Sequence, residues 1–194
     1  MKKITTLYKK DPNCLSRVIN EVDPDNAWVF GPDVTPTQKF DGSACMILNC
    51  ALYKRYDAKK GKPKPVGGIP CQDPDLITGH QPFWVPCWKD QPEDKYFCEG
   101  FEAMIDRKKG IPKEFNSFDG TYELCGPKIQ SNREHLETHK LLKHGSVVLD
   151  INDYSFESLK SYLSDPKNDI EGIVFHHKDG RMCKIRKSDF GVKR

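Results

Sequence analysis

The sequence predicts an α+β fold. Two stretches, 44–56 and 170–186, each hold two short apolar runs separated by a break, which is the pattern of a β-hairpin. Two others, 93–109 and 156–163, carry apolar residues at helical spacing. The chain has 194 residues, enough to bury a core and typical of one domain. We therefore expect a single domain over 1–194, built of paired strands and helices.

The composition suits a globular intracellular protein. The chain is 37% hydrophobic and 30% charged, and no apolar run approaches the roughly 18–20 residues that cross a bilayer. Residues 1–6 lack the apolar core of a signal peptide. We expect a protein of the cytoplasm or nucleus, without a membrane partner, whose eight cysteines stay reduced. Cys71, His80 and Cys87 could bind zinc, but their spacing matches no standard site, so zinc is not favoured.

Basic residues gather in three clusters, although the net charge is only +3. A single cluster is most simply a solvated surface balanced by nearby acids. Three clusters together favour a polyanionic partner, either a nucleic acid or a nucleotide. The clusters comprise Lys54, Arg55, Lys59, Lys60, Lys62 and Lys64; then Arg107, Lys108, Lys109 and Lys113; then Lys184, Arg186, Lys187, Lys193 and Arg194.

The N-terminal part delivers a lysine into a short turn. Residues 27–30 are expected to form a strand or a core anchor, and residues 31–33 a turn. Pro36 then begins an extended segment that ends in Gln38-Lys39-Phe40-Asp41-Gly42-Ser43. By itself, Lys-x-Asp-Gly is a weak signal, because four residues recur by chance.

Two strands are expected next, at 44–49 and 51–56. In the second strand, Arg55 shares a face with Tyr53. A hairpin made of these strands would bring Arg55 back toward Lys39.

Residues 61–92 are expected to form a long loop rather than a regular element. They hold seven of the 14 prolines and four of the 14 glycines, and both residue types interrupt helices and strands. The aromatic run 83–88 is expected to pack on the core or to cover a site. As a hypothesis, the lysines at 59–64 contact RNA.

The helix predicted over 93–109 carries a stripe that is expected to face the core. Asp90 and Glu93 are expected to form a capping box at its start. Gly110 and Pro112 are expected to end it. The stripe consists of Phe97, Phe101, Met104 and Ile105.

A strand is predicted over 121–125, with Glu123 on the same face as Cys125. A carboxylate inside an apolar strand needs a partner or a metal ion. The alternative is that Glu123 lies on the solvated face of an edge strand.

The next segment is less regular. Residues 128–145 fit either a helix or a loop, and an apolar strand is predicted over 146–151. A short amphipathic helix is predicted over 156–163, ending before Pro166. Three histidines have no nearby carboxylate at metal-ligand spacing and are expected on the surface: His135, His139 and His144.

The last hairpin, 170–186, turns at an Asp-Gly pair. Glu171 enters its first strand. Lys184 and Arg186 share one face of its second strand. Two cations on one face of an apolar hairpin are costly unless an anion lies there, which argues for a bound phosphate.

Four short motifs follow one another along the chain: Lys39-Phe40-Asp41-Gly42, Glu123-Leu124-Cys125-Gly126-Pro127, Glu171-Gly172-Ile173-Val174-Phe175 and Lys184-Ile185-Arg186-Lys187. Their residues and their order resemble those of the covalent nucleotidyltransferases, the superfamily of DNA ligases, RNA ligases and mRNA capping enzymes. The resemblance covers 39–187. The Glu-Leu-x-Gly-Pro form of the second motif, Gly79-His80 and Trp84-Val85-Pro86 are similar to the small ATP-dependent 5′-to-3′ RNA ligases of eukaryotes and viruses.

This resemblance implies an ATP-grasp-like adenylation domain over 1–194, with antiparallel sheets flanked by helices and no OB-fold domain. It also implies an ATP-dependent RNA ligase that joins a 5′-phosphate to a 3′-hydroxyl end through a lysine-AMP intermediate and an adenylated RNA end. The implied cofactors are ATP and Mg²⁺ or Mn²⁺, and the implied partner is RNA. We expect a monomer.

The matching residues imply roles. Lys39 would be the nucleophile and Lys184 a second catalytic residue. Only a neutral amine attacks, so the pKa of Lys39 must be lowered, and neighbouring cations would each disfavour its positive charge. The nucleotide-binding residues would be Gln38, Lys39, Arg55, Glu123, Glu171, Lys184 and Arg186, and the metal ligands Asp41, Glu123 and Glu171.

Two departures from the pattern stand out. Many relatives have Lys-x-Lys where this chain has Lys184 and Arg186, and many stack an aromatic on the base where it has 147–149. The nearest alternatives are a small DNA ligase or an RNA guanylyltransferase. A non-catalytic nucleic-acid-binding protein is a further alternative, and it predicts no covalent AMP.

Overall fold

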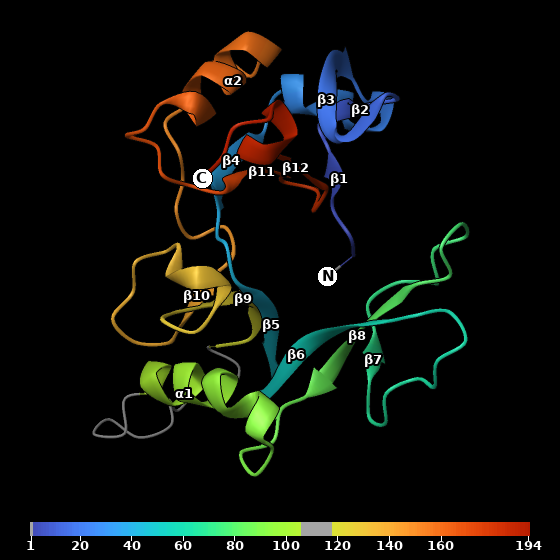
Figure 1. Cartoon of the computed structure of the whole chain (residues 1–194), viewed down its shortest axis with the longest axis vertical. Coiled ribbons are helices and arrows are strands. Elements are labelled where there is room, and N and C mark those ends of the chain that lie inside the picture. Colours follow the sequence, from blue (N-terminus) through green and yellow to red (C-terminus); the bar gives the residue numbers. More distant parts are fainter. Residues whose placement is uncertain (1, 106–117) are drawn as a thin grey trace. The chain divides into compact units, whose positions relative to one another are not determined.

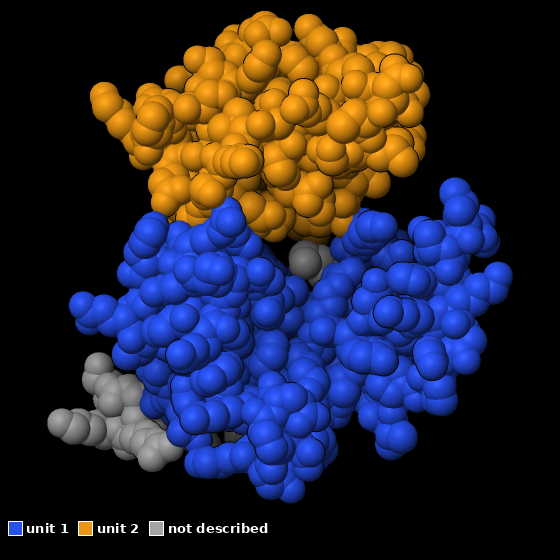
Figure 2. All heavy atoms as spheres, viewed as in Figure 1, with its two compact units in different colours: residues 1–3, 41–144 blue, residues 4–40, 145–194 orange. Residues whose placement is uncertain are grey.

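The computed structural model describes residues 2–105 and 118–194, and it is a mixed α+β structure with several antiparallel sheets (Figure 1). The chain divides into two compact units (Figure 2). Unit 1 holds Met1–Lys3 and Asp41–His144, and unit 2 holds Ile4–Phe40 and Gly145–Arg194. The α+β prediction is confirmed, whereas the single domain stays a prediction. None of the described helices is long and apolar enough to cross a membrane.

A four-stranded sheet organises unit 2. In sheet order its strands are β1 (Thr5–Thr6), β12 (Met182–Arg186), β11 (Gly172–His177) and β4 (Val34–Lys39). β1 runs parallel to β12, and the other neighbours are antiparallel. The predicted hairpin over 170–186 is confirmed. A separate two-stranded sheet, β2 (Tyr8–Asp11) and β3 (Cys14–Val22), was not predicted.

Helix α2 (Phe156–Ser164) covers one face of the four-stranded sheet, as the helical spacing predicted. Its Leu159 and Leu163 are fully buried, and so are Ile173 and Ile185 of the strands. Because side chains alternate along a strand, the residues between these point to the opposite face.

Residues 27–30 lie in a 3-10 helix, η1 (Pro24–Phe30), so the strand alternative is wrong. The core-anchor alternative is confirmed, because Val29 is fully buried. Pro24 occupies the first turn, where a proline costs no hydrogen bond. Asp23 caps the helix by accepting the backbone N–H of Asp25 at 3.0 Å.

The strand predicted over 146–151 is also wrong. The segment forms one antiparallel bridge, between Val148 and Thr37 of β4. The N–H of Ile151 donates back to the carbonyl of Leu149 at 3.1 Å. This local turn bends the chain away before further ladder bonds form.

A six-stranded sheet organises unit 1. In sheet order its strands are β10 (Lys140–Lys143), β9 (Gly120–Cys125), β5 (Ser43–Leu48), β6 (Ala51–Ala58), β8 (Gln81–Pro86) and β7 (Ile69–Pro70). All neighbouring pairs are antiparallel. The strands predicted at 44–49, 51–56 and 121–125 are thereby confirmed.

Helix α1 (Lys95–Met104) covers one face of this sheet (Figure 1). The predicted stripe is confirmed for Phe97, Phe101 and Met104, which pack on the buried cluster around Leu124. Its fourth residue, Ile105, is the extended C-cap that follows the end of α1.

Neither predicted end of this helix is confirmed. A short 3-10 turn, η2 (Pro92–Asp94), precedes α1. The N-cap of η2 is Gln91 and that of α1 is Asp94, and neither forms a side-chain cap hydrogen bond. The capping box of Asp90 and Glu93 is therefore wrong. The predicted stop at Gly110 and Pro112, and the basic cluster at 107–113, lie outside the described residues.

Residues 61–92 are not irregular throughout, because β7 and β8 lie among them. Phe83 and Trp84 are each 3% exposed, so the first part of the aromatic run packs on the core, whereas Trp88 is 60% exposed. The prolines of β8 obscured this strand. The carbonyl of Pro82 accepts the N–H of Cys71 at 2.9 Å, on the β7 side, so the ring nitrogen also faces that short strand rather than β6. A proline is tolerated where the sheet needs no N–H from it.

Candidate functional site

The strand register gathers three predicted site residues on one face of the unit 2 sheet. Lys39 ends β4 opposite Gly172 of β11, and Gly172 lies opposite Arg186 of β12. Directly opposed residues share a face, so Lys39 and Arg186 flank Gly172. In the next row Val174 lies opposite Lys184. Lys39, Lys184 and Arg186 therefore share the face that points away from the α2 core.

Gly172 is required by the close packing of β11 on β12. A Cβ atom there would lie 2.3 Å from the carbonyl oxygen of Ile185 and 2.8 Å from Cα of Arg186. Both are backbone atoms that cannot move aside, so a larger residue would push the two strands apart.

Glu171 lies just before β11 and forms an ion pair with the amine of Lys39. Both side chains are 21% exposed, so the pair is open to solvent. The carbonyl of Glu171 accepts the N–H of Lys187 at 2.9 Å, which anchors its backbone. The carboxylate thus holds the amine at the end of β4.

Burial, together with the nearby charges of Lys39 and Arg186, lowers the pKa of Lys184 to about 8. Glu171 and Asp189 act against this shift. Positive neighbours on the same face disfavour another positive charge. Lys184 therefore holds its proton less tightly than an ordinary lysine.

Arg186 is held by Asp189 of the short helix η4 (Lys187–Phe190). Its Nη2 lies 3.0 Å from Oδ1 of Asp189 and its Nε 3.3 Å from Oδ2. Lys10 of β2 lies 2.6 Å from the same carboxylate, which is fully buried. A lysine could not form this forked contact, which explains why an arginine suits position 186.

Asp41 and Gly42 begin the main segment of unit 1, where the chain runs close along β9. A Cβ atom at Gly42 would lie 2.2 Å from the carbonyl oxygen of Leu124. The N–H of Asp41 donates to Glu134 at 3.0 Å, and its carboxylate lies 3.7 Å from Nε of Arg133. The glycine of the Lys-x-Asp-Gly motif is therefore required by close approach to a neighbouring strand.

Glu123 has a protein partner that the sequence did not reveal. Its carboxylate lies 2.8 Å from Nε2 of His144, whose Nδ1 lies 3.0 Å from the hydroxyl of Thr121. The surface prediction is wrong for His144, which is 20% exposed, and for His139, which is 9% exposed and 2.7 Å from Glu99. Both carboxylates are distant in the sequence, so local spacing carried no signal.

Arg55 and Glu123 share one face of the unit 1 sheet. Glu123 lies opposite Ala44, and the next residue of β5 lies opposite Lys54. Lys54 therefore points to the other face, where it forms an ion pair with Asp94, a residue 1% exposed. This lysine of the predicted basic cluster is thus engaged inside the protein.

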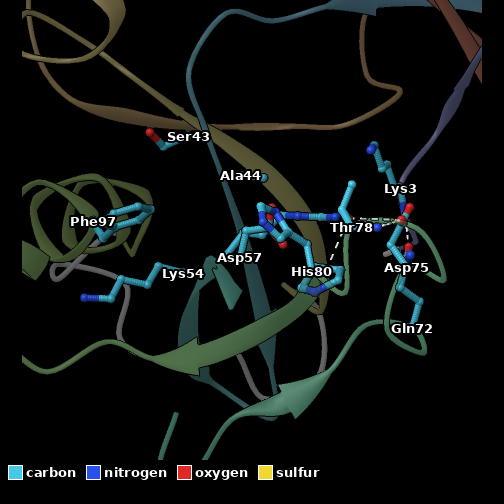
Figure 3. Close-up of a pocket in the computed structure, with 12 residues that line it drawn as sticks. Lys3, Ser43, Ala44, Lys54, Asp57, Gln72, Asp75, Thr78, His80 and Phe97 are labelled. Atoms are coloured by element: carbon cyan, nitrogen blue, oxygen red, sulfur yellow. Dashed lines mark hydrogen bonds and ion pairs between the residues drawn. The ribbon is translucent and has the colours of Figure 1, made fainter. Parts of the chain in front are cut away.

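Arg55 is one of the residues that line a pocket of about 620 Å³. Figure 3 shows this pocket. The guanidinium carbon of Arg55 lies 6.0 Å from the ring centre of Trp84, its opposite residue in β8. Ala44, Asp57 and His80 also line this pocket.

Gln38 lies opposite Ile173 in the register, on the face opposite to that of Lys39. Its backbone N–H donates to the carbonyl of Val147 at 2.9 Å. A contact between Gln38 and a nucleotide stays a prediction.

The predicted metal ligands belong to different units, with Asp41 and Glu123 in unit 1 and Glu171 in unit 2. Carboxylate oxygens are the ligands that Mg²⁺ prefers. Each one already faces a cation or an imidazole, as described above. Over residues 2–105 and 118–194, no three His, Cys, Asp or Glu side chains form a group that could hold a metal ion. An ion would bind through water or displace one of these contacts.

Comparison with known proteins adds one relative. No protein-family model matches the chain. The chain is similar to RNA ligase 1 of Pongo abelii, with 24% identity over 222 aligned residues. The alignment covers 81% of this chain and 67% of that protein. The similarity therefore extends over most of the described structure and includes both units.

Proposed function

We propose that this chain is an ATP-dependent RNA ligase that joins 5′-phosphate and 3′-hydroxyl ends through AMP bound covalently to Lys39. The observation that carries the proposal is the cationic face of the unit 2 sheet, on which Arg186 and Lys184 neighbour Lys39. The similarity to a protein named RNA ligase 1 supports RNA as the substrate. The antiparallel sheets and the four ordered motifs support a nucleotidyltransferase fold.

In the first step the ammonium of Lys39, which is ion-paired with Glu171 at rest, loses a proton to solvent, and the neutral amine attacks the α-phosphorus of ATP. An N–P bond forms, the P–O bond to pyrophosphate breaks, and the amine gives up a second proton to solvent. Glu171 contacts the amine and orients it. Lys184 and Arg186 lie on the same face and stabilise the negative charge on the phosphoryl oxygens.

In the second step an oxygen of the RNA 5′-phosphate attacks the AMP phosphorus, and the N–P bond breaks. The leaving nitrogen of Lys39 takes up a proton. Lys184 can supply it, because its pKa of about 8 leaves it charged at neutral pH yet able to donate. In the third step the 3′-hydroxyl attacks the 5′-phosphorus, a phosphodiester forms, and AMP leaves.

The remaining assignments are part of the same proposal. Gln38, Arg55 and Glu123 contact the nucleotide, with Glu123 at the ribose. Asp41, Glu123 and Glu171 hold Mg²⁺ or Mn²⁺, directly or through water, and the ion would neutralise phosphate charge.

Intact mass spectrometry after incubation with ATP and Mg²⁺ tests the proposal. The wild-type protein should gain one AMP, and Lys39→Ala should gain none. Lys178→Ala is the matched control, since Lys178 is a 70% exposed lysine of the same unit, and it should gain AMP like the wild type. An unlabelled wild type, or a labelled Lys39→Ala, contradicts the proposal.

The alternatives differ in substrate. A guanylyltransferase would take up GMP from GTP in the same assay, and a DNA ligase would seal nicked DNA faster than RNA ends. A non-catalytic binding protein would take up neither nucleotide.

A further inference from the structure

The loop between β7 and β8, residues 71–80, carries two exposed aliphatic side chains at its tip, Leu76 and Ile77. Leu76 is fully exposed and Ile77 is 93% exposed. Figure 1 shows the chain beyond β7 as a loop that projects away from the strands. Large aliphatic side chains are usually buried in a folded protein, and no step of the proposed reaction uses this tip.

The tip is held in shape by its own hydrogen bonds. Oδ1 of Asp75 accepts the backbone N–H groups of Ile77 and Thr78 at 3.1 and 2.8 Å. The carbonyl of Asp75 accepts the N–H of Gly79 at 2.7 Å, and the N–H of Asp75 donates to the carbonyl of His80 at 2.9 Å. Figure 3 shows Asp75, Thr78 and His80 on the side of the loop that lines the pocket. An ordered turn therefore presents the two aliphatic side chains to solvent.

The base of the loop is tied to the rest of unit 1. The side-chain amide of Gln81 donates to the carbonyl of Gln72 at 2.9 Å. Oε1 of Gln72 accepts the backbone N–H of Lys3 at 2.7 Å. The N–H of Cys71 donates to the carbonyl of Pro82 at 2.9 Å. Because both the base and the tip are hydrogen-bonded, the exposure of the two side chains is a fixed property of the fold.

Lysines surround this loop. The side chain of Lys60 lies beside the tip, because a Cβ atom at Gly79 would lie 2.9 Å from Cγ of Lys60. The chain has no acidic residue from 58 to 72. Within residues 2–105 and 118–194, six exposed lysines of this region form no ion pair: Lys2, Lys3, Lys59, Lys60, Lys62 and Lys64.

Three acids lie among these lysines. Asp57 lies 3.4 Å from Nδ1 of His80, and Asp73 is exposed. Hydrogen bonds from Thr78, and to a smaller extent the charge of Lys3, hold the pKa of Asp75 below its usual range. Six lysines against three acids leave the surface around the tip positive.

An apolar tip in front of basic side chains matches the surface of a bilayer that contains anionic lipids. Aliphatic side chains enter the boundary between headgroups and acyl chains, and lysines behind them meet the headgroups. RNA is the other polyanion that the lysines could meet. Its phosphates offer no apolar surface to an aliphatic side chain, and its bases stack on aromatic rings. The two aliphatic side chains therefore favour the lipid surface.

We infer that the tip of loop 71–80 docks on an anionic lipid surface, where Leu76 and Ile77 enter the headgroup boundary and the surrounding lysines meet the headgroups. The expectation of no membrane partner rested on apolar runs too short to span a bilayer. A tip that enters only the interface needs no such run. This contact goes beyond the proposed function, because it concerns where the protein binds rather than which ends it joins.

Co-sedimentation with lipid vesicles tests the inference. Vesicles of phosphatidylcholine with phosphatidylserine are compared with vesicles of phosphatidylcholine alone, and the wild type should prefer the former. The double substitution Leu76→Ser and Ile77→Ser should weaken binding about tenfold or more, the value of burying one aliphatic side chain. The double substitution Leu76→Phe and Ile77→Phe should keep the binding, because it preserves the apolar tip.

Leu15→Ser is the matched control, because Leu15 is also a strongly exposed leucine, at 73%, but lies on β3 of unit 2. It should bind vesicles like the wild type. Fluorescence anisotropy with a short single-stranded RNA should give the same affinity for the wild type and the double serine variant. Thermal unfolding of each variant checks that it folds.

A wild type that does not bind the anionic vesicles overturns the inference, and so does a folded double serine variant that binds them as tightly as the wild type. A double serine variant that loses affinity for RNA to the same extent assigns the tip to RNA and likewise overturns it. Gain of AMP at Lys39 should be unchanged in this variant. The lipid contact and the proposed ligase activity therefore fail separately.

Discussion

The carboxylate of Asp189 binds the guanidinium of Arg186 at two nitrogens, at the start of η4. The same carboxylate accepts the backbone N–H of Arg186 at 2.9 Å. Arg186 therefore faces the cationic site with its position already set, and Lys10 completes the charge balance around a buried acid.

Removing this acid should be costly. Asp189→Asn leaves two cations without their buried partner, and we expect the free energy of unfolding to fall by about 3–5 kcal/mol. Urea denaturation at neutral pH measures it. Asp179→Asn is the control, because Asp179 is 47% exposed beside Arg181 and should change stability little. Similar losses in both variants would contradict the role given to Asp189.

The loss of stability at acid pH should depend on the same residue, Asp189. Burial by itself would raise the pKa of Asp189, but the hydrogen bonds from Arg186 and Lys10 outweigh it and lower the pKa. A lowered carboxyl pKa stabilises the fold above the unfolded value, and this stabilisation disappears as pH falls. The wild type should lose more stability than Asp189→Asn between about pH 5 and pH 3. A parallel loss in both proteins would refute this.

Lys184 should give a pH dependence at the alkaline end. Its pKa of about 8 lies below the ordinary 10.5 of a lysine. Between these values the unfolded chain binds more protons at this residue, so the stability that Lys184 contributes rises with pH. The free energy of unfolding of the wild type minus that of Lys184→Met should increase from about pH 7 to about pH 9.5. A flat difference would mean an ordinary lysine.

Gly42 should not tolerate a side chain. The close approach to Leu124 predicts that Gly42→Ala lowers the free energy of unfolding by about 1–3 kcal/mol, the usual cost of overpacking. Gly31→Ala is the control, since its Cβ atom would lie 3.3 Å from the carbonyl of Trp28 and needs only a small shift. Thermal unfolding compares the two. Equal melting temperatures would show that β9 yields easily.

His144 should affect the rate of self-adenylation through its contact with Glu123. If His144 holds this carboxylate for the nucleotide, then His144→Ala and Glu123→Gln each slow self-adenylation, and the double variant is no slower than Glu123→Gln alone. Residues that act through one contact are not additive. Rates from the mass assay at several ATP concentrations measure the coupling. Additive effects of the two substitutions would show that His144 does not act through Glu123.

If the lysines at 59–64 bind RNA, the salt dependence of RNA affinity should change when they are replaced. Replacing Lys59, Lys60, Lys62 and Lys64 by glutamine should weaken RNA binding and reduce the slope of log affinity against log salt by about 0.7 for each phosphate that the protein no longer neutralises. Self-adenylation should persist. A matched set is Lys128, Lys140, Lys167 and Lys178, which are also exposed. An unchanged slope, or an equal loss of RNA binding and of self-adenylation, would contradict RNA binding by the lysines at 59–64.

Local pattern was enough to predict much of this structure. The alternation of Lys184 and Arg186 with Cys183 and Ile185 predicts one charged and one buried face, and Cys183 and Ile185 are indeed fully buried. The spacing of Leu159 and Leu163 likewise predicts the buried face of α2. Such signals lie within a few residues, because the periods of strands and helices are short.

The rest depended on contacts between distant segments. The partner of Glu123 is His144 and that of Arg186 is Asp189, and neither pairing follows from a periodicity. β8 was hidden by Pro82 and Pro86, which signal a loop unless the neighbouring strand is known. From the sequence alone, the four motifs were only a resemblance, without evidence that their residues lie together. The register is what unites Lys39 with Lys184 and Arg186.

The division of the chain has a consequence for its synthesis. Unit 1 is nearly continuous, and its sheet is complete once Lys143 has emerged from the ribosome. The sheet of unit 2 pairs β4 with β11 and β1 with β12, so its first strands must wait for residues beyond Gly172. Loops of that length close slowly. Unit 1 can therefore fold while the nascent chain grows, whereas the lysine that we propose as the nucleophile acquires its neighbours only near the end of translation.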